Sequence, residues 1–298
     1  MKRLKKNSEI RNRTYLLRRI PVIMRLDGQT FKSYTKHLVK PFDEGLIEDM
    51  QQTAIYLCQN IQGAKCAYVQ SDEISILITD YDTFDTQAWF DYEKEKMCSI
   101  SAGYAVGRFN QLRLVREARE FGDLVSSQIN GATLANFDSR VSNYSKEEVA
   151  NYFLARQKDA VKNSISMLAQ SLYSHSALNK MNGNQKQEMC FQKGINWNDL
   201  HFSKKRGSFI VKNTYINGKL LLPFESTHQN PENSVFLYEN NYYNWFKCEN
   251  QNVDDGGLRH NDIDYYLDKP IEKPIIRSKW EVVETPLTFT HKDFEKWL

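Results

Sequence analysis

Two aspartates stand at the ends of predicted β-strands, where their side chains could hold divalent cations. Asp27 closes an apolar run, residues 21–27, and Asp72 precedes an alternating run, residues 73–78. If these strands are neighbours, the two carboxylates meet and repel each other unless a cation lies between them. Carboxylate oxygens suit Mg²⁺, which keeps waters and takes substrate phosphates as its remaining ligands. Two such ions can activate an attacking hydroxyl and stabilise the leaving oxygen of one displacement.

The residues after Asp27 have the properties of a phosphate-binding segment. Gly28 lets the backbone approach a phosphate or a metal closely. Residues 29–32 offer backbone N–H groups to a triphosphate, and Lys40 could neutralise its charge. A purely structural interpretation stays open, because Asp-Gly after a strand is commonly a turn and Ser-Asp-Glu is commonly an exposed loop.

The elements that must position these residues follow from the spacing of apolar side chains. The strand of residues 21–27 begins at a proline, and Gly28 is expected to end it. A helical stripe with spacings of three and four begins after Asp43, which is a suitable N-cap residue. The pattern further predicts strands at residues 67–72 and 73–78 joined by a tight turn, a mainly helical segment at 85–120, and a strand at 133–141.

The order β-α-β-β-α-β in the first 143 residues is the ferredoxin-like plan, which polymerase and cyclase palms use. We therefore predict an α+β fold, with a palm of antiparallel sheet and packed helices plus a C-terminal elaboration. Residues 1–143 would form the palm catalytic domain with a basic N-terminal segment. Residues 144–298 would complete the core and the RNA-binding surface. A fold of this kind does not by itself prove the function.

The second half of the chain contains fewer clear signals. Residues 145–148 form a capping box that opens a long helix. A basic segment at 204–207 precedes a strand-like run at 208–212. Residues 225–263 are rich in Asn, Asp and Tyr, and we expect loops or an elaboration there.

Composition indicates a globular protein. The 298 residues are 41% hydrophobic and 26% charged. No run approaches the roughly 18 apolar residues of a membrane helix, and the N-terminus lacks the apolar stretch of a secretion signal. We expect a cytoplasmic protein that makes no membrane contact, in which scattered cysteines are buried free thiols. These are Cys58, Cys66, Cys98, Cys190 and Cys248.

The net charge of +3 does not identify a nucleic-acid partner, but the N-terminus is strongly basic. Such a run either solvates a chain terminus or lies along a phosphate backbone. Residues 2–19 hold eight cations against the single acid Glu9: Lys2, Arg3, Lys5, Lys6, Arg11, Arg13, Arg18 and Arg19.

Six segments, taken together and in order, resemble the tRNA(His) guanylyltransferase family and its wider group of tRNA 5′-end-repairing, 3′-to-5′ polymerases. Each segment alone is a weak signal, whereas six in the family's order are specific. They span about residues 10–212, and two C-terminal segments, 277–280 and 285–286, are also similar. The six segments are residues 25–31, 36–43, 70–73, 137–141, 156–159 and 194–198, the last followed by 205–207.

The resemblance implies a polymerase-like palm that adds nucleotides to the 5′ end of a tRNA in the 3′-to-5′ direction. A tRNA 5′-monophosphate is first activated with ATP, or a 5′-triphosphate is used directly. The 3′-hydroxyl of an incoming nucleotide, typically GTP, then attacks the 5′ α-phosphate. The implied partners are the 5′ end and acceptor stem of the tRNA, nucleoside triphosphates, two Mg²⁺ ions and further copies of the chain in a homotetramer.

Site residues are carried over position by position from this resemblance. Asp27, Asp72 and the carbonyl of Gly28 would hold the two Mg²⁺ ions, with Glu73 beside them as a further catalytic residue. The triphosphate would contact Gln29, Thr30, Phe31, Lys32, Lys40 and Ser71, and Asp43 would contact the activating nucleotide. RNA phosphates would meet Arg140, Arg156, Asn163, Lys186, Lys204, Lys205 and Arg206.

One departure from the family pattern bears on the substrate. Histidine-tRNA enzymes carry a His-Ile-Asn-Asn stretch where this chain has residues 161–164, Val-Lys-Asn-Ser. The missing histidine favours the repair-type branch, which rebuilds truncated tRNA 5′ ends against a template base. Two other functions stay open: a different palm-type nucleotidyl enzyme such as a cyclase, and a catalytically silent RNA-binding module.

Overall fold

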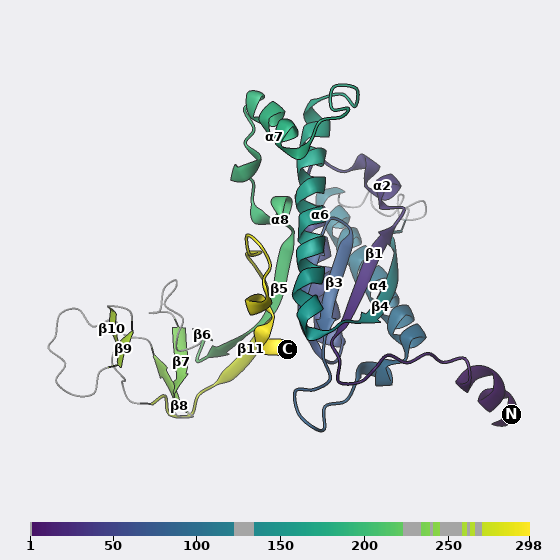
Figure 1. Ribbon diagram of the computed structural model, residues 1–298, viewed down its shortest axis with the longest axis vertical. Coiled ribbons are helices and arrows are strands. Elements are labelled where there is room, and N and C mark those ends of the chain that lie inside the picture. The colour runs from purple at the N-terminus through teal and green to yellow at the C-terminus, as the bar shows by residue number, and fades with distance from the viewer. Residues whose placement is uncertain are drawn as a thin grey trace. The chain divides into compact units, whose positions relative to one another are not determined.

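The computed structural model describes residues 2–121, 134–222, 234–238, 241–244, 258–260, 263–265 and 270–298 (Figure 1). These residues belong to two compact units, Met1–Val211 with Val282–Leu298, and Lys212–Glu281. No helix in these ranges is both long and apolar enough to cross a membrane. The expected division of roles at residue 143 stays a prediction.

An antiparallel sheet in the order β4-β1-β3-β2-β5 forms the centre of the first unit. Its central strands are buried on both faces, because β1 buries Val22, Ile23 and Met24, and all six residues of β3 are buried. The chain order β1, α3, β2, β3, α4, β4 confirms the predicted β-α-β-β-α-β arrangement. The strands are β1 Val22–Gln29, β2 Ala64–Gln70, β3 Glu73–Ile78, β4 Asn136–Asn143 and β5 Ser208–Ile216.

Helices α3 (Glu44–Asn60) and α4 (Lys94–Phe121) pack together on one side of this sheet (Figure 1). Asp43 is the predicted N-cap of α3, since its carboxylate accepts a hydrogen bond from the Leu46 N–H at 2.7 Å. Helix α4 buries residues at steps of four, Met97, Ser101, Ala105, Phe109 and Arg113. A one-sided stripe of this kind places a helix flat against a core.

Helix α6 (Lys146–Leu172) covers the opposite face (Figure 1). Its Val149 and Phe153 pack on Ile23 of β1 and Leu77 of β3 in one hydrophobic cluster. The C-terminal segment joins the same cluster through Phe289 and Phe294, both of them buried. The last residues of the chain therefore complete the core that the N-terminal strands begin.

Beyond the core, α6 continues to a smaller apolar cluster with α7 (Gly183–Gln192). Ile165 and Leu168 of α6 pack there with Cys190 and Trp197. Cys58, Cys66, Cys98 and Cys190 are free thiols. Burial raises the pKa of Cys58 and Cys66, as expected of inert core cysteines.

Several local predictions are wrong in detail. Gly28 does not end β1, which continues to Gln29 because β4 pairs with it that far. The Ser145 side chain makes no capping hydrogen bond at the start of α6, and the Glu148 N–H donates to the Ser145 carbonyl instead. The helix predicted from residue 85 begins as α4 at Lys94, after a short 3-10 turn.

The second unit consists of short strands. The end of β5 pairs with β6 (Lys219–Leu221) and with β11 (Ile276–Val283). Strand β7 (Ser234–Tyr238) lies between β6 and β8 (Asn241–Asn244). Leu258–His260 and Ile263–Tyr265 form a separate two-stranded sheet, β9 and β10. Residues 225–263, which were predicted to form loops or an elaboration, thus contain strands, and the remaining residues of that range lie outside the described ranges.

Candidate active site

Three acidic residues lie side by side across the sheet near the end of β1. Asp27 of β1 is in register with Glu73 of β3 on one side and with Asp138 of β4 on the other. Directly opposite residues of antiparallel strands project from the same face, and like charges in such pairs repel. Because Ile23 and Asp27 are four residues apart on one strand, the three acids share the face that α6 covers.

Glu73 has a cationic partner from α6. The Arg156 guanidinium binds it with two hydrogen bonds, Nε to Oε1 at 2.7 Å and Nη2 to Oε2 at 2.6 Å. Arg156 also contacts Asp159, one helical turn along, at 3.0 Å. Glu73 is only 4% exposed, so this bidentate pair is what allows a carboxylate at that depth.

Asp138 and Asp27 differ from Glu73, and from each other, in how well their negative charge is compensated. Asp138 pairs with Arg140 at 3.2 Å and is half-exposed, so that water also screens its charge. Asp27 has a weaker partner, since the Nη2 of Arg25 lies 3.7 Å from its carboxylate and makes no hydrogen bond with it. Asp27 is therefore the least compensated acid of the row.

Asp72 lies in the tight turn between β2 and β3, beside Asp27. Its carbonyl accepts a hydrogen bond from the Gly28 N–H at 3.0 Å, which joins the turn to the end of β1. Ser71 takes the left-handed backbone conformation (φ 50°) that the turn needs. Burial raises the pKa of Asp72, and the charges of Asp27 and Glu73 raise it further, against hydrogen bonds from its own backbone and Ser71.

These two aspartates fit the chemistry of a divalent-cation site. Asp72 makes no ion pair within the described residues, and that of Asp27 is long, so negative charge remains for a cation to neutralise. No group of three or more His, Cys, Asp and Glu side chains forms a metal cluster in the described ranges. A bound ion would therefore complete its shell with backbone, water and phosphate oxygens, as Mg²⁺ commonly does.

The glycine at position 28 has a packing role that the sequence did not suggest. A Cβ added there would lie 2.3 Å from the Phe31 ring. Phe31 is buried and stacks among Tyr34, Phe109 and Phe137, with ring centroids 5.1 to 5.7 Å away. The absence of a side chain at Gly28 lets the next turn, α2 (Phe31–Tyr34), fold back against the strand.

A cavity of about 320 Å³ lies beside Asp72. That volume is in the range of small-ligand sites, and its lining combines an apolar wall with charged groups, as such sites do. The apolar wall consists of Phe31, Leu38, Val39, Pro41, Phe42, Leu46, Ile47 and Met167. The polar lining includes Lys32, Lys40, Asp43, Ser71, Asp72, Asn163, Lys204 and Lys205.

Many predicted nucleotide-binding residues thus meet in one cavity. Two of them also have structural contacts. The Lys40 ammonium donates to the Thr35 carbonyl at 2.7 Å, and the Asp43 carboxylate accepts from the N–H groups of Leu46 and Val39. Asp27, Gly28, Gln29 and Thr30 do not line this cavity and lie along the neighbouring edge of β1 and the start of α2.

The predicted RNA-contacting residues differ in their exposure and in their contacts with the rest of the protein. Arg206 is 9% exposed and bonds to the Thr285 carbonyl, so its side chain belongs to the protein interior. Arg156 is engaged by Glu73 as described above. Lys204 pairs with Glu44 at 2.6 Å and Lys186 donates to Ser166 at 3.1 Å. Asn163 is exposed at the cavity.

Apart from Phe31, which was predicted to contact the nucleotide, the apolar wall was missed by sequence reasoning. Leu46 and Ile47 looked like ordinary members of the α3 core stripe, although neither is fully buried. Val39, next to Lys40, is 68% exposed, and the sequence alone does not show that exposure.

Residues 2–145 match the family model described as tRNAHis guanylyltransferase. A bacterial tRNA(His) guanylyltransferase (Thg1)-like protein, solved in complex with GTP, is 36% identical and has a TM-score of 0.65. That likeness covers 99% of this chain and 95% of the other. The chain belongs to the tRNA(His) guanylyltransferase family.

Further relatives agree with this assignment. A bacterial tRNA(His) guanylyltransferase (Thg1)-like protein, solved in complex with ATP, is 45% identical over 70% of this chain and 87% of the other, with a TM-score of 0.64. A probable tRNA(His) guanylyltransferase of Drosophila melanogaster is 25% identical over 218 residues, 68% of this chain and 71% of that protein. The chain is thus a guanylyltransferase-like enzyme of the nucleotidyltransferase class.

Proposed function

We propose that this enzyme adds nucleotides to the 5′ end of tRNA in the 3′-to-5′ direction, with ATP and GTP as substrates and two Mg²⁺ ions. The observation that carries the proposal is the pair Asp27 and Asp72: Asp72 lines the cavity and makes no ion pair within the described residues, and the adjacent Asp27 makes only a long one. The family and its relatives solved with ATP and GTP support nucleotide as the ligand of that cavity. In this view the first unit acts as a polymerase-like palm.

The reaction transfers a phosphoryl group at the 5′ end of the RNA. A 5′-monophosphate is first joined to the adenylyl group of ATP, and pyrophosphate leaves. The 3′-hydroxyl of the incoming nucleotide then forms a bond to the RNA 5′ α-phosphate, its proton goes to solvent, and AMP leaves. With a 5′-triphosphate RNA the same attack expels pyrophosphate directly. When Mg²⁺ is bound, it favours ionisation of the attacking hydroxyl and neutralises the leaving oxygen.

The chain's own residues bind and orient the reactants. Asp27, Asp72 and the Gly28 carbonyl would hold the ions. Lys32, Lys40 and Ser71 would contact the triphosphate, while the apolar wall accepts the base. Arg156 would act indirectly, because its bonds to Glu73 neutralise the charge of a third carboxylate beside the pair.

We infer that the enzyme is of the repair type, in which a template base selects the nucleotide added. The support is the stretch 161–164, which lacks the histidine of histidine-tRNA enzymes. Asn163 of this stretch is exposed at the cavity, within reach of RNA at the site. A homotetrameric assembly and a cytoplasmic location are part of the same proposal.

The proposed function is tested with tRNAs that lack the first nucleotide. The enzyme, Mg²⁺ and labelled nucleotides are incubated with truncated tRNAs whose 5′ end is a monophosphate or a triphosphate. A product one nucleotide longer is expected, and its identity should follow the opposing base when that base is changed. Addition of G regardless of the opposing base would instead indicate strict histidine-tRNA processing, and no extension of any RNA would refute the proposal.

Matched variants assign the reaction to the proposed site. Asp72→Asn should abolish extension because it removes a metal ligand while preserving shape. Asp82→Asn is the control, since Asp82 is exposed and its one ion pair among the described residues is with Lys65, and it should extend tRNA like the unmodified enzyme. Full activity of Asp72→Asn would refute the metal assignment.

A further inference from the structure

The N-terminal segment, residues 2–19, forms a basic arm with two distinct parts. Its outer part comprises a helical turn at Lys2–Leu4 and a π-helix at Lys5–Ile10. Arg3, Lys5, Lys6 and Arg11 are exposed there and form no ion pair with any residue that the structure describes. These four cations therefore have no acidic partner among the described side chains.

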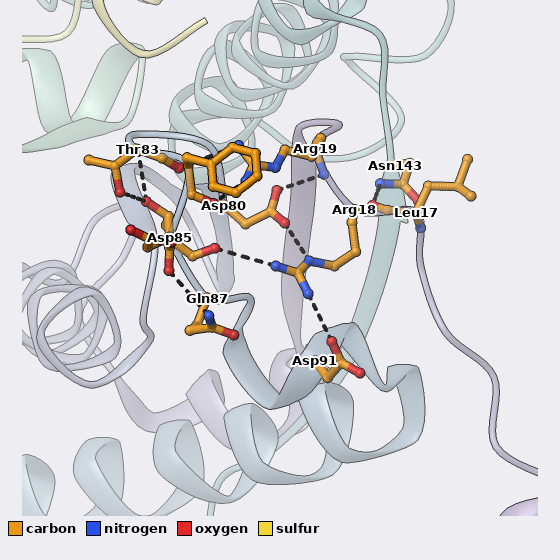
Figure 2. Close-up of polar contacts among 11 residues, drawn as sticks. Leu17, Arg18, Arg19, Asp80, Thr83, Asp85, Gln87, Asp91 and Asn143 are labelled. Atoms are coloured by element: carbon orange, nitrogen blue, oxygen red, sulfur yellow. Dashed lines mark hydrogen bonds and ion pairs between the residues drawn. The ribbon is translucent and has the colours of Figure 1, made fainter.

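The inner part of the arm is fixed to the first unit at Asp80 (Figure 2). The Arg18 guanidinium donates to the Asp80 carboxylate at 2.6 Å and to Asp91 at 2.9 Å. The Arg19 N–H donates to the other Asp80 oxygen at 2.8 Å, and its guanidinium binds the carbonyls of Thr83 and Phe84. Asp80 is fully buried, so this attachment is part of the folded core.

Backbone contacts continue the attachment toward the outer part. The Leu16 N–H donates to the Tyr92 carbonyl at 3.0 Å, and the Lys94 N–H donates to the Thr14 carbonyl at 2.8 Å. Leu17 exchanges two hydrogen bonds with the Asn143 side chain, at 2.9 and 3.1 Å. The arm is therefore held from Thr14 onward, and the four exposed cations all precede that point.

We propose that the outer part of the arm binds the phosphate backbone of the RNA substrate. This inference rests on the proposed function, which supplies a polyanionic RNA. Neutralising phosphates releases counterions, so exposed Lys and Arg side chains contribute most when no acid competes for them. The inner arginines differ, because Asp80 and Asp91 already neutralise Arg18.

The test measures tRNA binding to the full chain by fluorescence anisotropy over a range of KCl concentrations. The variant Arg3→Ala, Lys5→Ala, Lys6→Ala, Arg11→Ala should bind more weakly, by roughly 10-fold or more at low salt. The slope of log K against log salt should fall by about 3, since each lost phosphate contact removes roughly 0.7 to 0.9. The matched control Arg3→Lys, Lys5→Arg, Lys6→Arg, Arg11→Lys keeps every charge and should bind like the unmodified enzyme.

The outcomes separate the arm from the catalytic proposal. If the enzyme is active but its alanine variant keeps the same tRNA affinity and salt slope, the RNA-binding role of the arm is refuted and the proposed function stands. Salt-dependent binding through the arm, without any nucleotide addition, overturns the proposed function alone. Vesicles of anionic phospholipid serve as a second probe, because Leu4 and Ile10 are exposed beside the cations. Vesicle binding that the alanine variant loses, with tRNA binding unchanged, would overturn RNA as the partner.

Discussion

Strand β3 has an aspartate near each of its ends, and only one of the two has a cationic partner among the described residues. Asp80, just beyond Ile78, is fully buried and receives hydrogen bonds from Arg18 and from the Arg19 backbone. Asp72, just before Glu73, forms no ion pair in the described ranges, and its pKa is raised by burial and by neighbouring acids.

The difference distinguishes a structural carboxylate, Asp80, from Asp72, which we propose to be functional. A buried acid that contributes to stability needs a cation supplied by the fold, as Asp80 has. An acid that is left uncompensated beside other acids costs stability, and such an arrangement persists where it binds a ligand or cation. The contrast supports the proposal that Asp72 takes part in the chemistry, whereas Asp80 attaches the arm.

The largest expected effect is on activity at the Asp72 end. Asp72→Asn and Asp27→Asn should each lower kcat for tRNA extension by at least about 100-fold, because each removes a ligand of the ions that stabilise the transition state. Neither variant should lower the urea midpoint of unfolding, since a repelling charge is removed. A variant that kept its activity but lost stability would make Asp72 resemble Asp80 and break the comparison.

Variants of the Glu73–Arg156 pair test whether Arg156 stabilises the fold by neutralising the buried Glu73 carboxylate. Arg156→Gln leaves a buried carboxylate beside Asp27 and should lower the free energy of unfolding by about 3 kcal/mol or more. Glu73→Gln combined with Arg156→Gln should recover much of that loss, because both charges are then absent. Urea titrations of the two single variants and the double variant give the coupling free energy, and additive losses would contradict the pairing.

At the other end of β3, Asp80→Asn should lower the free energy of unfolding by about 2 to 3 kcal/mol. The estimate lies below that for a fully buried pair because the Arg18 side chain is 38% exposed and can be hydrated. The folded fraction should retain its kcat. The control Asp82→Asn removes a carboxylate that is 53% exposed, so although its partner Lys65 is largely buried it should change stability by less than Asp80→Asn does, by about 1 kcal/mol or less. Equal losses in the two variants would contradict the buried role of Asp80.

The smallest expected effect is on the pH dependence of the free energy of unfolding. Because the folded-state pKa of Asp72 is raised above its usual 3.8, the folded state binds the proton more tightly than the unfolded state does. Its contribution to stability is therefore present at low pH and is lost as pH rises from about 3.8 through the folded pKa. Stability of Asp72→Asn relative to the unmodified enzyme should rise across that window, and a fall would contradict the sign.

Local patterns predicted the sheet and much of the site. The strand ending near Asp27, the hairpin around Asp72 and the N-cap Asp43 all depend on neighbouring residues, whose spacing is visible in the sequence. The cavity likewise contains Lys32, Lys40 and Ser71, which lie close to those elements.

Contacts between distant segments were not predictable in the same way. Arg156 and Glu73 are 83 residues apart, whereas Arg156 and Asp159 are three apart on one helix, so local spacing indicates only the second contact. Arg18 and Asp80 are 62 residues apart, so the attachment of the arm appears only when β1 and β3 pair. The Gly28 requirement depends on a ring that folds back from Phe31.

The most direct test of the account is anomalous diffraction from crystals of the enzyme grown with Mn²⁺ and a non-hydrolysable GTP analogue. The account predicts a manganese peak bound to carboxylate oxygens of both Asp27 and Asp72, with the analogue's phosphates completing the shell, and no such peak in Asp72→Asn crystals. A nucleotide in the cavity with the two carboxylates turned apart and no ion between them would contradict it.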